Sequence, residues 1–110
     1  MKFLSIWERR ETMPLPPNAL RQLAEAQGAY AKQNLKAGEI KEIYYAPGWD
    51  RFIIISEDKS IEDWYKAASA GPAFAFFKIE LYPLADFTES MNTMSEMLKR
   101  MENMAAAMPK

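Results

Sequence analysis

Alternation of apolar and polar residues predicts four strands within the first 85 residues of the chain. The clearest strand follows a break at Gly71-Pro72 and ends at Pro83, because proline interrupts both helices and strand pairing. The predicted strands are Lys2–Arg9, Glu39–Tyr45, Arg51–Ser56 and Phe76–Tyr82. The third contains the run Phe52–Ile55, which is apolar on both faces and is therefore typical of a central strand covered on both sides.

Apolar residues at helical spacing predict two helices between these strands. The first begins at Pro17, where the fixed φ of proline suits the first helical turn, and it ends near Ala37. Gly38 follows as a natural C-cap glycine. The second helix covers about Ile61–Ala70 and has Ser60 as its N-cap.

The order of these elements, βαββαβ, indicates an α+β protein with the ferredoxin-like arrangement. In that arrangement two helices cover one face of a four-stranded antiparallel sheet, and the other face stays open. Because Phe52–Ile55 is apolar on both faces, we expect a second copy of the chain to cover the open face and complete a dimeric α+β barrel. We expect residues 1–85 to form this domain.

The pattern of residues 86–110 predicts an added, methionine-rich amphipathic helix. Asp86 and Glu89 resemble a capping box at its start. The following apolar residues recur at alternating spacings of four and three, which is the a/d pattern of a coiled coil: Phe87, Met91, Met94, Leu98, Met101, Ala105 and Met108. One small protomer is too short to cover such a helix, so we expect it to pack against another subunit and strengthen or enlarge the oligomer.

The two faces of the sheet differ in composition. We assign Leu4 and Ile6, together with Phe77, Ile79 and Leu81, to the face beneath the helices. The dimer-facing side then gathers aromatic residues and a few charges, namely Phe3, Ser5, Trp7, Arg9, Ile40, Glu42, Tyr44, Phe76, Lys78, Glu80 and Tyr82. Apolar walls with sparse polar groups are typical of a small-molecule pocket. A plain dimer interface, in which these charges simply pair, predicts the same pattern.

Composition narrows the classes of function. A net charge of −1 gives no electrostatic reason to expect nucleic acid or a membrane surface as a partner. The absence of cysteine excludes disulfides and fits a cytoplasmic protein. The chain lacks histidine, which is the commonest general base and transition-metal ligand, and its carboxylates show no metal-ligand spacing. We therefore expect neither a metal nor a cofactor.

Three groups of residues carry a family resemblance by their order and spacing. They are Ala29-Tyr30 with Leu35 and Gly38; Gly48-Trp49 with Phe52; and Ser69, Pro72, Phe74, Ile79-Glu80 and Pro83-Leu84-Ala85. Over about Met1–Ala85 the chain thereby resembles the muconolactone isomerase family, whose ferredoxin-like protomers form dimeric α+β barrels. In place of a histidine near the N-terminus, this chain has Ser5 and Trp7.

The resemblance implies an isomerase that moves a proton between carbons of a lactone-like or enolisable acid. Such a reaction needs a carboxylate base in an apolar pocket, and Glu80 and Glu42 are the candidate catalytic bases. A cation or a hydroxyl group must stabilise the enolate charge. The candidate substrate-binding residues are Trp7, Arg9, Tyr44, Phe76, Lys78 and Tyr82.

Two alternatives from other functional classes remain open. The same superfamily includes cofactorless monooxygenases, which need only a pocket for an electron-rich aromatic substrate, and Trp7 and Tyr44 permit such a pocket. A non-catalytic module for ligand binding or assembly would bind or associate without turning a substrate over. A haem enzyme would usually need an axial histidine, which this chain does not have.

Overall fold

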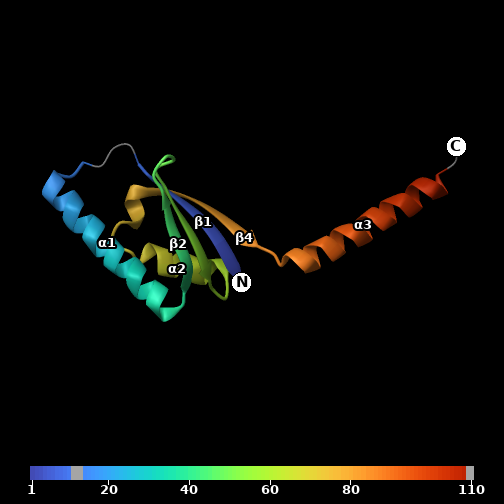
Figure 1. Ribbon diagram of the computed structural model, residues 1–110, viewed down its shortest axis with the longest axis horizontal. Helices are drawn as coiled ribbons and strands as arrows, with labels where there is room; N and C mark the ends of the chain where they lie inside the picture. The colour runs from blue at the N-terminus through green and yellow to red at the C-terminus, as the bar shows by residue number, and fades with distance from the viewer. Residues whose placement is uncertain (11–13, 109–110) are drawn as a thin grey trace.

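The computed structural model describes residues 1–10 and 14–108, so Pro109 and Lys110 of the predicted C-terminal segment lie outside the described residues. Figure 1 shows a small sheet-and-helix body and one long helix that leaves it. The elements are β1 (Lys2–Arg9), α1 (Pro17–Ala37), β2 (Ile40–Ala46), β3 (Arg51–Glu57), α2 (Ile61–Ser69), the 3-10 helix η1 (Phe74–Phe76), β4 (Phe77–Leu84) and α3 (Phe87–Ala107). The predicted βαββαβ order and the added helix are confirmed.

The four strands form one antiparallel sheet in the order β2-β3-β1-β4. The central strands are therefore β1 and β3, as the ferredoxin-like arrangement requires. Helices α1 and α2 lie against the same face of this sheet (Figure 1). Residues of both helices accordingly line one cavity beside Trp7. The predicted ferredoxin-like fold is confirmed, and the dimer stays a prediction.

Local capping groups set the ends of the helices. The Ser60 side chain accepts a hydrogen bond from the Asp63 backbone N–H at 3.1 Å, which caps the start of α2. Asp86 accepts in the same way from the Glu89 N–H at 2.9 Å and starts α3. Gly38 ends α1 with a φ of 85°, a left-handed conformation that glycine adopts without a steric penalty.

The core lies between the sheet and α2. Phe3 and Trp7 of β1 are buried there beside Trp64 of α2. The antiparallel register sets Trp7 opposite Phe52 on β3 and opposite Ile79 on β4, so these three side chains share the helix-covered face. The prediction that Phe77, Ile79 and Leu81 lie beneath the helices is confirmed, because all three pack against this core.

The assignment of the two faces of β1 was wrong. Leu4 and Ile6 lie on the open face of the sheet, and Phe3, Ser5 and Trp7 lie beneath the helices. Strand β1 has apolar residues at both parities, so alternation alone does not decide its orientation. Burying the large rings of Phe3 and Trp7 removes more apolar area from water than burying two aliphatic side chains.

Helix α3 projects from the body after β4 (Figure 1), and the protein is 72 Å along its longest axis. The predicted seam is exposed along the helix, with Met91, Met94 and Met101 each about half accessible. Packing of α3 on another subunit stays a prediction. Within residues 1–10 and 14–108, no helix is long and apolar enough to cross a membrane.

Candidate functional site

A cavity of about 400 Å³ lies between α1 and the helix-covered face of the sheet. Its walls are mainly apolar and are contributed by α1, by all four strands and by η1; they include Leu20, Leu23, Ala24, Ile43, Phe52, Phe76 and Phe77. Small residues on the inner side of α1 leave this space open. A Cβ atom added at Gly28, which lines the cavity, would meet no heavy atom within 4 Å.

A polar network adjoins this cavity where β1 meets the β2–β3 turn. The Arg9 Nη2 group, whose side chain lines the cavity, donates to the two carboxylate oxygens of Asp50 at 2.9 and 3.1 Å. The Tyr45 hydroxyl group donates to Asp50 Oδ1 at 2.6 Å. Asp50 has a φ of 52°, a left-handed conformation that aspartate tolerates better than most residues. The turn thus orients one carboxylate toward both side chains.

Hydrogen bonding sets the protonation of this network. The Tyr45 hydroxyl, and then Arg9, hold the pKa of Asp50 below its usual value. The same hydrogen bond to Asp50 raises the pKa of Tyr45. Asp50 is therefore an anion that holds Arg9 in place. A guanidinium group has five N–H donors, and Asp50 engages only Nη2, so Arg9 keeps donors for a ligand carboxylate.

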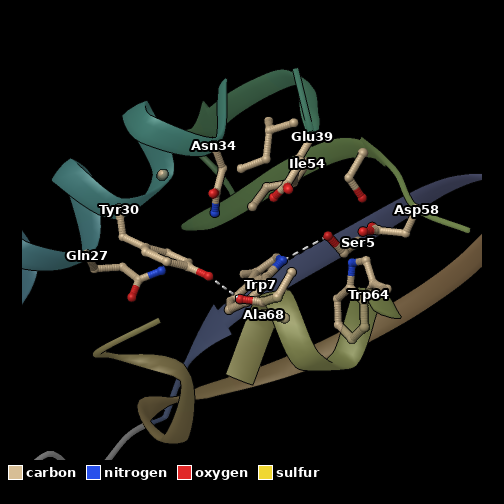
Figure 2. A pocket seen from close by; sticks show the side chains of 14 residues that line it. Ser5, Trp7, Gln27, Tyr30, Asn34, Glu39, Ile54, Asp58, Trp64 and Ala68 are labelled. Carbon is tan, nitrogen blue, oxygen red and sulfur yellow. Dashed lines mark hydrogen bonds between the residues drawn. The ribbon is translucent and has the colours of Figure 1, made fainter. Parts of the chain in front are cut away.

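A second, smaller cavity of about 60 Å³ adjoins the first, and both are lined by Trp7, Gln27, Ala31 and Ile54. Figure 2 shows it between α1, α2 and the sheet, with Ser5, Asn34, Glu39 and Asp58 around it. Trp7 Nε1 donates to Ser5 Oγ at 2.8 Å, and the Tyr30 hydroxyl donates to the carbonyl of Ala67. This cavity is more polar than the large one.

Two side chains of the small cavity stand out. The Ser56 hydroxyl is buried and has no hydrogen-bond partner among residues 1–10 and 14–108. The pKa of Asp58 is raised, first by its burial and then by the negative charges of Glu39 and Asp63, while the N-terminal amine acts in the opposite direction. Ser56 and Asp58 are two positions apart at the end of β3, so both side chains reach the same cavity.

The predicted site residues divide between the two faces of the sheet. Trp7, Arg9 and Phe76 line the large cavity beneath the helices. The others alternate with helix-facing residues and lie on the open face, namely Glu42, Tyr44, Lys78, Glu80 and Tyr82. The expectation that all eight share one surface was therefore wrong. Its cause is the reversed orientation of β1 and the placement of Phe76 in η1 instead of β4.

On the open face, Glu80 lies opposite Ile6 and Glu42 lies opposite Ile55. The Tyr82 hydroxyl donates to Glu80 Oε2 at 2.8 Å, and this hydrogen bond raises the pKa of Tyr82. Neither candidate base is among the residues that line the two cavities.

Sequence reasoning missed several polar residues that line the cavities, among them Gln27, Tyr45, Ser56 and Asp58, and it missed Asp50, which accepts from Tyr45 and Arg9. A signal existed for two of them. Ser56 and Asp58 continue the alternation of β3 past its apolar run, so both point beneath the helices if Ile54 does. The Tyr45–Asp50–Arg9 network joins residues 41 positions apart, and no local pattern indicates it.

The crystal structure of muconolactone isomerase is similar to this chain, with a TM-score of 0.71 over 78% of this chain and 90% of that chain. The chain has the muconolactone isomerase fold. Sequence identity to muconolactone isomerase is 17%, so the likeness concerns architecture and leaves the reaction open. No family model matches the sequence. No curated protein matches it either.

Proposed function

We propose that this protein binds a small, mainly apolar organic acid in the large cavity and isomerises it by proton transfer. The observation that carries the proposal is the cavity of about 400 Å³, which has apolar walls and the Arg9 guanidinium group in its lining. This volume falls in the range of small-molecule sites, which typically combine apolar walls with a few orienting polar groups. The ligand would be lactone-like or enolisable.

The fold supports the reaction class, because muconolactone isomerase has the same architecture. Proton transfer at carbon needs a base and a donor that stabilises enolate charge, both in an environment that excludes water. Arg9, held by Asp50, would bind the ligand carboxylate, while Trp7 and Phe76 contact its apolar part. Glu80 and Glu42 would act as bases only on a ligand bound at the open face.

We propose a second copy of the chain as the occupant of the open face. Leu4, Ile6, Ile53 and Ile55 form an apolar centre there, on the two central strands. Charged side chains of the edge strands, such as Glu42 and Lys78, surround this centre. An apolar centre within a polar rim is the usual composition of a protein interface.

The ligand site can be tested with muconolactone as the probe and the tryptophan indole N–H resonances as reporters. We expect the Trp7 resonance to shift on titration because Trp7 lines both cavities, whereas Trp49 is half-exposed and lines neither. Gly28→Leu should abolish the shift by filling the cavity. Arg9→Gln should weaken binding by roughly 10- to 150-fold, because hydrogen bonds to charged groups contribute about 1.5–3 kcal/mol.

Glu80→Gln serves as the matched control, because Glu80 lies on the open face. A Glu80→Gln protein that loses binding while Gly28→Leu retains it would place the ligand on the open face and refute the cavity. The reaction is followed as incorporation of deuterium from heavy water into muconolactone by proton NMR. Binding without exchange would identify a ligand-binding module in place of an isomerase.

A further inference from the structure

The buried Ser56 hydroxyl group in the small cavity has no hydrogen-bond partner among the described residues. Ser56 is 5% exposed, and its Oγ has no hydrogen bond within the described part of the chain. A buried hydroxyl group without a partner costs free energy, so such groups normally bond to protein, to water or to a ligand. The Ser5 hydroxyl, which lines the same cavity, accepts from Trp7 and makes no hydrogen bond to Ser56. The position of Ser56 thus calls for an oxygen atom inside the cavity.

The charged residues that line the small cavity limit which chemical group can supply this oxygen atom. Glu39 and Asp58 contribute carboxyl groups, and neither lysine nor arginine is among the described residues that line it. A ligand carboxylate would be repelled here, whereas a carbonyl oxygen would accept a hydrogen bond from Ser56. A volume of about 60 Å³ admits a group of this size. Trp7 and Ile54 line both this cavity and the large one, so one ligand can extend from one into the other.

We propose that the small cavity is the proton-transfer end of the ligand site, where the Asp58 carboxyl group moves the proton and the Ser56 hydroxyl group binds the ligand carbonyl oxygen. This inference rests on the proposed function. Asp58 takes a proton from the carbon next to the carbonyl, so a C–H bond breaks and an O–H bond forms. The electron pair moves into an enolate, whose oxygen accepts from Ser56. Returning the proton to a different carbon completes a redox-neutral isomerisation.

The surroundings of Asp58 suit this role. Burial and the carboxylates of Glu39 and Asp63 raise its pKa, and only the N-terminal amine opposes them. A carboxyl group whose pKa approaches the working pH is a better general base than one that is always ionised, because the conjugate acid must also return the proton. On α1, the Tyr30 hydroxyl group donates to the Ala67 carbonyl (Figure 2).

The test compares deuterium exchange into muconolactone for three variants. Asp58→Asn should lower the exchange rate by at least roughly 100-fold, the usual contribution of a general base. Ser56→Ala should lower it roughly 100-fold, as removal of one oxyanion donor does. Glu57→Gln is the matched control, because Glu57 is adjacent in sequence but exposed and paired with Lys41, and it should exchange at the wild-type rate.

Further readouts separate the failure of this inference from failure of the proposed function. If muconolactone shifts Trp7 and Asp58→Asn exchanges as fast as wild type, the role of Asp58 is refuted while the ligand site stands. In wild type the exchange rate should rise with pH through a pKa above the usual aspartate range, and a flat profile refutes the base. A high-resolution crystal structure of the unliganded protein should contain an ordered oxygen bonded to Ser56 Oγ. An empty cavity there would refute the oxygen subsite.

Discussion

Replacing Gly28 by alanine should stabilise the protein, although the residue lines a cavity proposed to hold a ligand. Gly28 lies in the middle of α1 and has no positive φ, so a helical alanine fits its backbone. Glycine inside a helix is about 0.8–1.0 kcal/mol less favourable than alanine, because it loses more backbone freedom on folding. The added methyl group meets no heavy atom within 4 Å, so no steric cost offsets this gain.

The expected gain in the free energy of unfolding comes from helix propensity alone, because the added methyl group enters open space and makes few packing contacts. With an unfolding entropy of roughly 2.1 cal/mol/K per residue over 110 residues, a gain of 1 kcal/mol raises Tm by about 4 °C. We expect a rise of about 3–4 °C in a thermal melt followed by far-UV circular dichroism. Chemical denaturation should give a higher midpoint with an unchanged m-value.

Gly38→Ala is the control, because it makes the same chemical change in the same helix. Gly38 has a φ of 85°, and the left-handed conformation costs other residues roughly 1–2 kcal/mol, so this variant should melt at a lower temperature. If Gly28→Ala is destabilising, α1 packs closely on the sheet at this position and the cavity is not open. Equal effects of both variants would refute the conformational argument.

Three further predictions follow from other parts of the structure. Asp58 has a raised pKa in the folded state, so its favourable contribution to the free energy of unfolding is complete below its unfolded pKa and is lost as the pH rises through its folded pKa. The Tm of Asp58→Asn relative to wild type should therefore rise over this pH window. A Tm difference that does not depend on pH would contradict this prediction. Trp64→Ala should cost about 3–5 kcal/mol of unfolding free energy in urea, because Trp64 packs in the core with its ring centroid 6.4 Å from that of Trp7. Truncation after Ala85 should lower the number of subunits in the oligomer, as calculated from the mass measured by light scattering. An unchanged number of subunits together with an unchanged Tm would exclude an assembly role for α3.

The sequence predicts the elements of this fold well because their ends are local. Pro17, the Ser60 and Asp86 caps and the left-handed Gly38 act within a few residues, and each one occurs at the expected place. The predicted end at Pro83 was wrong, because Pro83 lies opposite Phe3 and β4 continues to Leu84. Face assignment depends on alternation, which works for β4 because its charged and apolar residues strictly alternate. It fails for β1, where both parities are apolar and only packing against α2 decides.

The reversal of β1 limits how much of the site the sequence could predict. Once β1 is turned, Trp7 and Arg9 leave the surface that holds Glu80 and Glu42, and the predicted site separates into two. The contacts of Arg9 depend on the tertiary approach of the β2–β3 turn, which no spacing encodes. The alternation of β3 indicated the face of Ser56, but its burial could not be predicted, since a serine at the end of a strand usually faces water.

Because α3 is exposed, we expect its helix content to depend on protein concentration. Every described residue of α3 except Ser90 is exposed, so tertiary packing gives the helix almost no support. An isolated helix of about 20 residues without an alanine-rich sequence is marginal in water, because nucleation is costly. If the seam pairs only in an oligomer, mass action couples helix content to assembly. Dilution should then unwind residues 87–107 and expose them to proteases while the sheet remains folded.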